Sequence, residues 1–145
     1  MPIPAVSPAT VSVVFDSALI KTLVYTGGSS FTLELARYAS ANGLIQPGSS
    51  TGLLTVTDAT ANAALQSLIA SFLTARNLTG TVDGLAIYGN IQGTTLRGSF
   101  KMILDGSPII VPDVYAEAAN DQSFAVLLTT FIAAIQTYNT TAGII

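Results

Sequence analysis

The segment from Gly80 to Pro112 limits the possible folds of this chain more than any other part of its sequence. Its middle run alternates, with Leu96, Gly98, Phe100, Met102 and Leu104 on one face and Thr95, Arg97, Ser99 and Lys101 on the other. This period of two predicts a strand with one face in a core and the other in water. Asp105-Gly106 follows directly and predicts a type I′ hairpin turn, because both central residues of that turn need φ > 0.

We expect three strands in this segment, at Thr81–Asn90, Thr94–Leu104 and Ser107–Val111. Strands joined by short hairpin turns pair antiparallel. Pro108 cannot donate a backbone hydrogen bond to a neighbouring strand, so the third strand should lie at an edge of the sheet or begin there.

Two segments have the periodicity of an amphipathic helix. In Asp58–Asn77, Asp58 is a suitable N-cap, and the apolar stripe consists of Leu65, Leu68, Ile69, Phe72 and Leu73. In Asp121–Tyr138, the apolar seam consists of Phe124, Leu128, Phe131, Ile135 and Tyr138. Both helices are predicted to bury these residues against the sheet or against a partner.

The first part of the chain is less clearly patterned. Val11–Thr26 predicts two strands, or one strand with a bulge at Asp16-Ser17. Leu53–Thr57 predicts a short strand, and the composition of Gln46–Gly52 predicts a loop.

Phe31–Asn42 is compatible with two kinds of element. As a strand, its apolar residues Phe31, Leu33 and Leu35 would alternate with polar ones. As a helix, it would have Ser30 as its N-cap and Gly43 after its last turn. The alanines at positions 36, 39 and 41 favour the helix.

Together these elements predict an α+β fold with a mostly antiparallel sheet and two to three helices packed on one face. We expect an extended, proline-punctuated N-terminal arm at residues 1–10, a single α+β domain at 11–138 and a C-terminal tail at 139–145.

Charge argues against nucleic acid as a partner. The net charge is −3, whereas nucleic-acid binding needs clustered Lys and Arg. The five basic residues are spread singly, at Lys21, Arg37, Arg76, Arg97 and Lys101. Along the sequence the tyrosines do not interleave with them, which argues against a platform for stacking bases.

The chain has no cysteine and no histidine. Disulfides and thiolate metal sites are therefore excluded, and the commonest general base and metal ligand is missing. We predict no catalytic residue, no cofactor and no metal. Asp113, Glu117 and Asp121 are spaced by four and could share a helix face that holds calcium, but a solvated acidic face is the favoured interpretation.

Gly48-Ser49-Ser50-Thr51-Gly52 matches the G-x-S-x-G pattern of a nucleophile elbow. That elbow needs a strand before the serine, a helix after it and a histidine base. Pro47 precedes the motif and the chain has no histidine, so we interpret the segment as a flexible loop.

Met1-Pro2-Ile3 resembles the start of the tautomerase family. In that family the initiator methionine is lost and the amino-terminal proline acts as a base, which would give this role to Pro2. Tautomerases run straight into a strand, whereas Pro4 and Pro8 interrupt this chain.

By elimination, the leading hypothesis is a structural, self-assembling protein, most specifically a virion component (coat, decoration or tail protein), and not an enzyme. Only 9% of the residues are charged, against roughly 25% in a typical soluble domain. Such a surface does little to keep copies apart. The predicted partner is a second copy of the chain or a viral lattice, with no nucleic acid and no membrane. The apolar residues of the two end segments are expected to contact it: Ile3, Val6, Ile144 and Ile145.

The alternatives come from other classes. One is a small enzyme or ligand-binding domain that works without His or Cys, with a pocket between the sheet and a helix and with Pro2 or an acidic side chain as its polar group. Another is a surface adhesion module. No signal peptide or transmembrane helix is visible, and the expected location is a virion or, alternatively, the cytoplasm.

Overall fold

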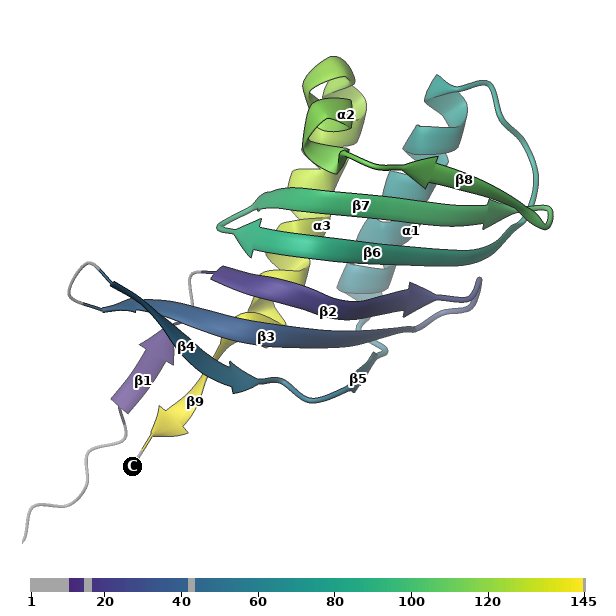
Figure 1. Cartoon of the computed structure of the whole chain (residues 1–145). Helices are drawn as coiled ribbons and strands as arrows, with labels where there is room; N and C mark the ends of the chain where they lie inside the picture. The colour runs from purple at the N-terminus through teal and green to yellow at the C-terminus, as the bar shows by residue number, and fades with distance from the viewer. Residues whose placement is uncertain (1–10, 15–16, 42–43, 145) are drawn as a thin grey trace, which may run out of the picture.

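The computed structural model of the chain describes residues 11–14, 17–41 and 44–144 (Figure 1). Its largest element is a seven-stranded antiparallel sheet with the spatial order β4-β3-β2-β6-β7-β8, in which β5 also pairs with β3. The strands are β2 (Ser17–Tyr25), β3 (Phe31–Ala41), β4 (Leu44–Ser50), β5 (Leu54–Val56), β6 (Val82–Gln92), β7 (Thr95–Leu104) and β8 (Ser107–Val111). The expected α+β fold is confirmed.

Two long helices, α1 (Ala59–Ala75) and α3 (Gln122–Asn139), contact each other and cover one face of the sheet (Figure 1). A short helix, α2 (Val114–Asn120), contacts β7 and α3. β8 pairs only with Phe100–Leu104 of β7, and α2 lies beside the part of β7 that β8 leaves unpaired. Both predicted amphipathic helices are thus confirmed.

Aromatic side chains join the helices to the sheet. Phe72 of α1 lies between Phe100 of β7 and Phe124 of α3, with ring centroids 5.1 and 6.0 Å away. Phe131 of α3 meets Phe31 of β3 edge to face at 5.8 Å. All five rings are buried, so the core is continuous from β3 to β7 beneath the two helices.

Polar groups fix the ends of the helices. The Asp58 carboxylate accepts the Ala61 N–H at 2.9 Å, as an N-cap should. The Arg37 guanidinium of β3 donates to the Tyr138 carbonyl at the end of α3, at 3.1 Å. The negative end of the helix dipole favours a cation at this position. Burial raises the pKa of the Tyr138 phenol, and the Asp58 carboxylate raises it further. The start of α1 and the end of α3 therefore lie close together at the β3 side of the sheet.

The predicted hairpin turn is confirmed. Asp105 and Gly106 have φ of 48° and 81°, as a type I′ turn requires. The Asp105 carboxylate also accepts the Thr81 N–H, and Asp83 accepts the Gly106 N–H, both at 3.0 Å. The β7–β8 turn is thereby tied to the start of β6. β8 is an edge strand, as Pro108 predicted.

The expected helix over Phe31–Asn42 is wrong, because residues 31–41 form β3. Phe31, Leu33 and Leu35 are all buried in the core, so the alternating pattern decides this segment. β3 pairs with β2 along one edge and with β4 and β5 along the other. These backbone pairings outweigh the helix preference of the alanines. Residues 42–43 lie outside the described part.

The expected loop at Gln46–Gly52 is also partly wrong, because β4 continues to Ser50. β3 offers backbone partners here, and Tyr38 pairs with Pro47. A proline is tolerated because β4 lies at the edge of the sheet. Thr51 and Gly52 follow outside the strand, and the short strand expected over residues 53–57 is present as β5.

A separate two-stranded sheet joins the two end regions of the described chain. β1 (Val11–Val14) pairs antiparallel with β9 (Thr140–Ile144), and Figure 1 shows this ribbon projecting away from the main sheet. The prediction of two strands in residues 11–26 is confirmed. Asp16 and the expected arm at 1–10 lie outside the described residues.

Gly98 lies where the backbones of β6 and β7 approach each other closely. It pairs directly with Gly89, and a Cβ added to Gly98 would overlap the Tyr88 carbonyl oxygen and the Gly89 Cα. Gly98→Ala should therefore lower the free energy of unfolding by about 1–3 kcal/mol, the usual cost of overpacking. Urea unfolding followed by circular dichroism measures this. Gly28→Ala is the control, because a Cβ there meets nothing within 4 Å; equal effects of the two substitutions would contradict the close approach.

Candidate functional site

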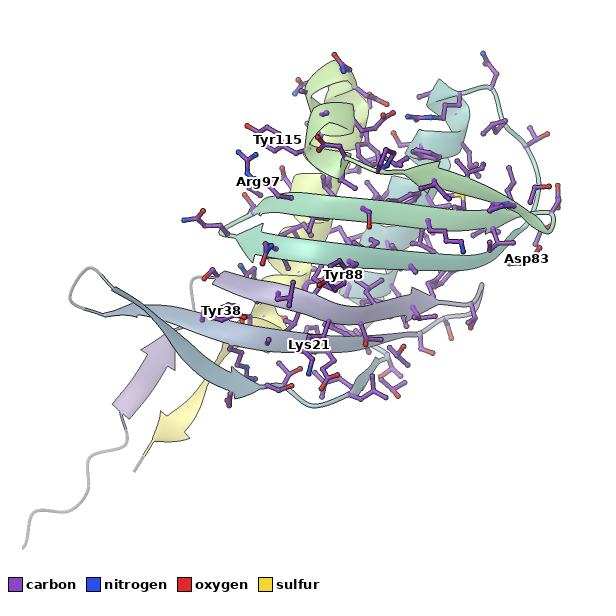
Figure 2. The ribbon with its side chains drawn as sticks, viewed as in Figure 1. Lys21, Tyr38, Asp83, Tyr88, Arg97 and Tyr115 are labelled. Carbon is purple, nitrogen blue, oxygen red and sulfur yellow. The ribbon has the colours of Figure 1, made fainter. Side chains whose placement is uncertain are left out.

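The sheet face opposite α1 and α3 is not covered by any element of the described chain (Figure 2). We call it the open face. Along β2, the first part of β3, β6 and β7, the buried residues alternate with residues that point to this side. Those outward residues include Lys21, Val24, Thr32, Glu34, Tyr38, Ala86, Tyr88, Asn90, Arg97, Ser99 and Lys101.

Tyr88 occupies the middle of the open face (Figure 2) and is 55% exposed. It pairs with Ser99 of β7, so Arg97 and Lys101 occupy the two diagonal positions beside it, within reach of long side chains. On its other side lies β2, whose register with β6 shifts between Ile20 and Val24, where Lys21 stands. Three of the five basic residues of the chain therefore lie on this face, on the strands next to Tyr88.

The open face carries a net positive charge. Its acidic residue is Glu34, which forms an ion pair with Lys21 at 3.7 Å and accepts a hydrogen bond from the Ser50 hydroxyl at 3.1 Å. Among the described residues neither Arg97 nor Lys101 forms an ion pair, and the Arg97 guanidinium lies 4.0 Å from the centre of the Tyr115 ring. This stacking links α2 to the open face.

The remaining described carboxylates lie at helix ends or beside the β7–β8 turn. Asp113 and Asp121 accept the Ala116 and Phe124 N–H groups, each at 3.1 Å, and Glu117 pairs with Arg76. Residues 114–120 are helical, but the carboxylates considered for calcium are engaged in these contacts. The described residues contain no group of three His, Cys, Asp or Glu side chains suited to a metal.

A pocket of about 240 Å³ lies between the β6–β7 turn, α2 and α3. Its lining consists of Thr94, Thr95, Thr129 and Tyr115 together with Leu and Ala residues. The ligand-binding alternative expected such a pocket with an acidic side chain or Pro2. None of the described lining residues is acidic, and Pro2 lies outside the described residues.

The G-x-S-x-G segment does not form a nucleophile elbow. Ser50 ends β4, its hydroxyl donates to Glu34, and it accepts the Gly52 N–H at 3.1 Å. A short strand follows instead of a helix.

Sequence reasoning missed the cluster around Tyr88, because Tyr88 and the basic residues are separated along the chain. The hairpin contained the necessary signal. A two-residue β6–β7 turn at Gly93-Thr94 fixes the register, and that register places Tyr88 opposite Ser99. The contribution of Lys21 depends on the pairing of β2 with β6, which the sequence pattern does not specify.

Tyr88 is expected to contribute little to folding, because its ring lies mostly in water. Tyr88→Ala should change the free energy of unfolding by about 0.5 kcal/mol or less, whereas Phe100→Ala, on the buried face of the neighbouring strand, should cost about 3–5 kcal/mol. Urea unfolding of both variants measures the difference. A loss for Tyr88→Ala as large as that for Phe100→Ala would make Tyr88 a structural residue.

Comparisons with protein-family models, with curated proteins and with solved structures find no significant match to this chain. No helix among the described residues combines the length and apolar character of a membrane span. The fold class therefore rests on strand order and helix packing, and the function is inferred from the side chains of the open face.

Proposed function

We propose that this protein is a structural, self-assembling protein that uses the open face of its sheet to bind the acidic surface of a second copy. The observation that carries the proposal is the exposed Tyr88 ring on a face that also presents Lys21, Arg97 and Lys101 from the neighbouring strands. Tyr and Arg are enriched at protein interfaces and dominate the energy of many of them.

The distribution of charge supports a second copy as the occupant. The open face is positive, whereas the other described charges are mostly carboxylates: Asp58, Asp83, Asp105, Asp113, Glu117 and Asp121. Opposite charges on two surfaces of the same chain steer copies into contact. The net charge of −3 repels a polyanion, which disfavours nucleic acid on this face.

A solvated open face is the ordinary state of an antiparallel sheet, so exposure alone does not carry the proposal. The proposal rests on the arrangement of side chains at the centre of this face. A large exposed aromatic side chain shares this face with Arg97 and Lys101, which lack an ion-pair partner in the described residues. An acidic, partly apolar partner surface would satisfy both the ring and the charges.

The β1–β9 ribbon supports assembly independently. Each of its strands has one partner in the described chain, which leaves an outer edge of backbone N–H and C=O groups on each side. Such edges are templates for pairing with another chain. A virion lattice is the setting we propose, since each copy in a lattice must contact neighbours through more than one surface.

The first test is the native mass of the full-length protein by light scattering over a range of concentrations. We expect mass above the 14.9 kDa monomer, and partial dissociation in high salt, because salt screens exposed charges. Lys21→Gln with Lys101→Gln should weaken association about tenfold or more. Arg97 is retained because it stacks on Tyr115.

The matched control is Ser123→Glu with Ala133→Glu. It changes the net charge by the same amount at exposed positions of α3, on the other side of the molecule. Association equal to wild type is expected for this control. A wild-type monomer at every concentration would contradict the proposal. Tight binding of a labelled single-stranded oligothymidylate, lost in the double lysine variant, would reassign the open face to nucleic acid.

A further inference from the structure

A second surface of the chain complements the open face. An open hollow of about 280 Å³ lies where the exposed side of α1 meets the ends of β2 and β6, and its lining includes Ile69, Ala70, Leu73 and Val82. The hollow is open to solvent and presents these apolar side chains to a partner.

Two carboxylates stand beside this hollow. Asp105 accepts the N–H of Thr81, which is one of its lining residues. Asp83 follows Val82 directly and accepts the Gly106 N–H, and both acids are exposed. Figure 2 shows Asp83 at the end of the sheet, away from Tyr88. The surface is thus an apolar hollow with acidic groups at its rim.

We propose that Tyr88 of one copy inserts into this hollow of a second copy, with Lys21, Arg97 and Lys101 meeting Asp83 and Asp105. This inference rests on the proposed function and names the partner surface. An exposed ring on a basic face and an apolar hollow beside carboxylates are complementary in polarity and in charge. Both surfaces lie on every copy.

The rival arrangement is a two-fold contact between two open faces. The open face has its own hollow of about 240 Å³, lined by Val24, Ala86, Lys101 and Ile103, which could receive Tyr88 of a symmetry mate. That contact would bring the cations of both copies together, and like charges across an interface oppose association. The acidic hollow is therefore the better partner for the ring.

A contact between two different patches is heterologous. A pair of copies then retains one free Tyr88 ring, on one copy, and one free hollow, on the other, so association continues until a ring of subunits closes or a filament forms. Through the open face alone, a two-fold contact would stop at the dimer. The two arrangements thus differ in the mass of the final assembly and in the behaviour of mixed variants.

The test mixes two full-length variants, each blocked on one surface. Tyr88→Ala removes the ring but leaves the hollow. Ala70→Arg fills the hollow and adds a cation to it, at an exposed helix position that tolerates arginine. Ala133→Arg is the matched control, because it makes the same substitution at an exposed position of α3. Sedimentation velocity measures the mass of each variant and of the mixture.

We expect each blocked variant to associate at least about tenfold more weakly than wild type, Ala133→Arg to match wild type, and the mixture to regain association by pairing the intact ring of one variant with the intact hollow of the other. Wild-type assembly that persists in both blocked variants would overturn this inference and leave the proposed function standing. Loss of association in Tyr88→Ala with none in Ala70→Arg would assign the two-fold contact instead. Wild type that stays monomeric would overturn both.

Discussion

The packing of Phe72 between Phe100 and Phe124 decides which face of the sheet is buried. Burial of these rings commits α1 and α3 to one side of β6 and β7, and the two-residue period of the strands then sends the alternate residues to the other side. The open face, with Tyr88 and its basic neighbours, is a consequence of that commitment. A register slip of one residue would exchange the two sets, which the core residues of β7 oppose.

Because the chain has few charged residues, the position of each one strongly affects the charge of the surface around it. Most carboxylates work locally, as caps of α1, α2 and α3 or as acceptors at the β7–β8 turn. These positions concentrate negative charge at helix ends and at one end of the sheet. The basic residues on β2 and β7 neither cap helices nor stabilise turns. They lie on one face of the sheet together with a single described carboxylate, Glu34. The separation of charge thus follows from where the fold needs acceptors.

The hairpins of β6, β7 and β8, both long helices and the Asp105-Gly106 turn were predictable, because local chemistry and periodicity agree there. Phe31–Ala41 and Gln46–Ser50 were not, since their local preferences disagree with their partners. Alanine favours a helix at positions 36, 39 and 41. However, β3 pairs with β2 along one edge and with β4 and β5 along the other. Pro47 suggests a loop, but an edge strand accepts it. In both places long-range pairing overrides local propensity.

The sequence alone determined the fold class, the buried stripes of the helices and the inward face of β7, because these depend on periodicity within one element. It also determined that chemistry based on histidine or cysteine is absent. Only the tertiary structure decided which residues form the candidate site. The ring of Tyr88 and the charge of Lys21 lie on strands that are neighbours in space but separated in sequence by β3, β4, β5 and α1. The pairing of β2 with β6, which local patterns do not specify, brings them together.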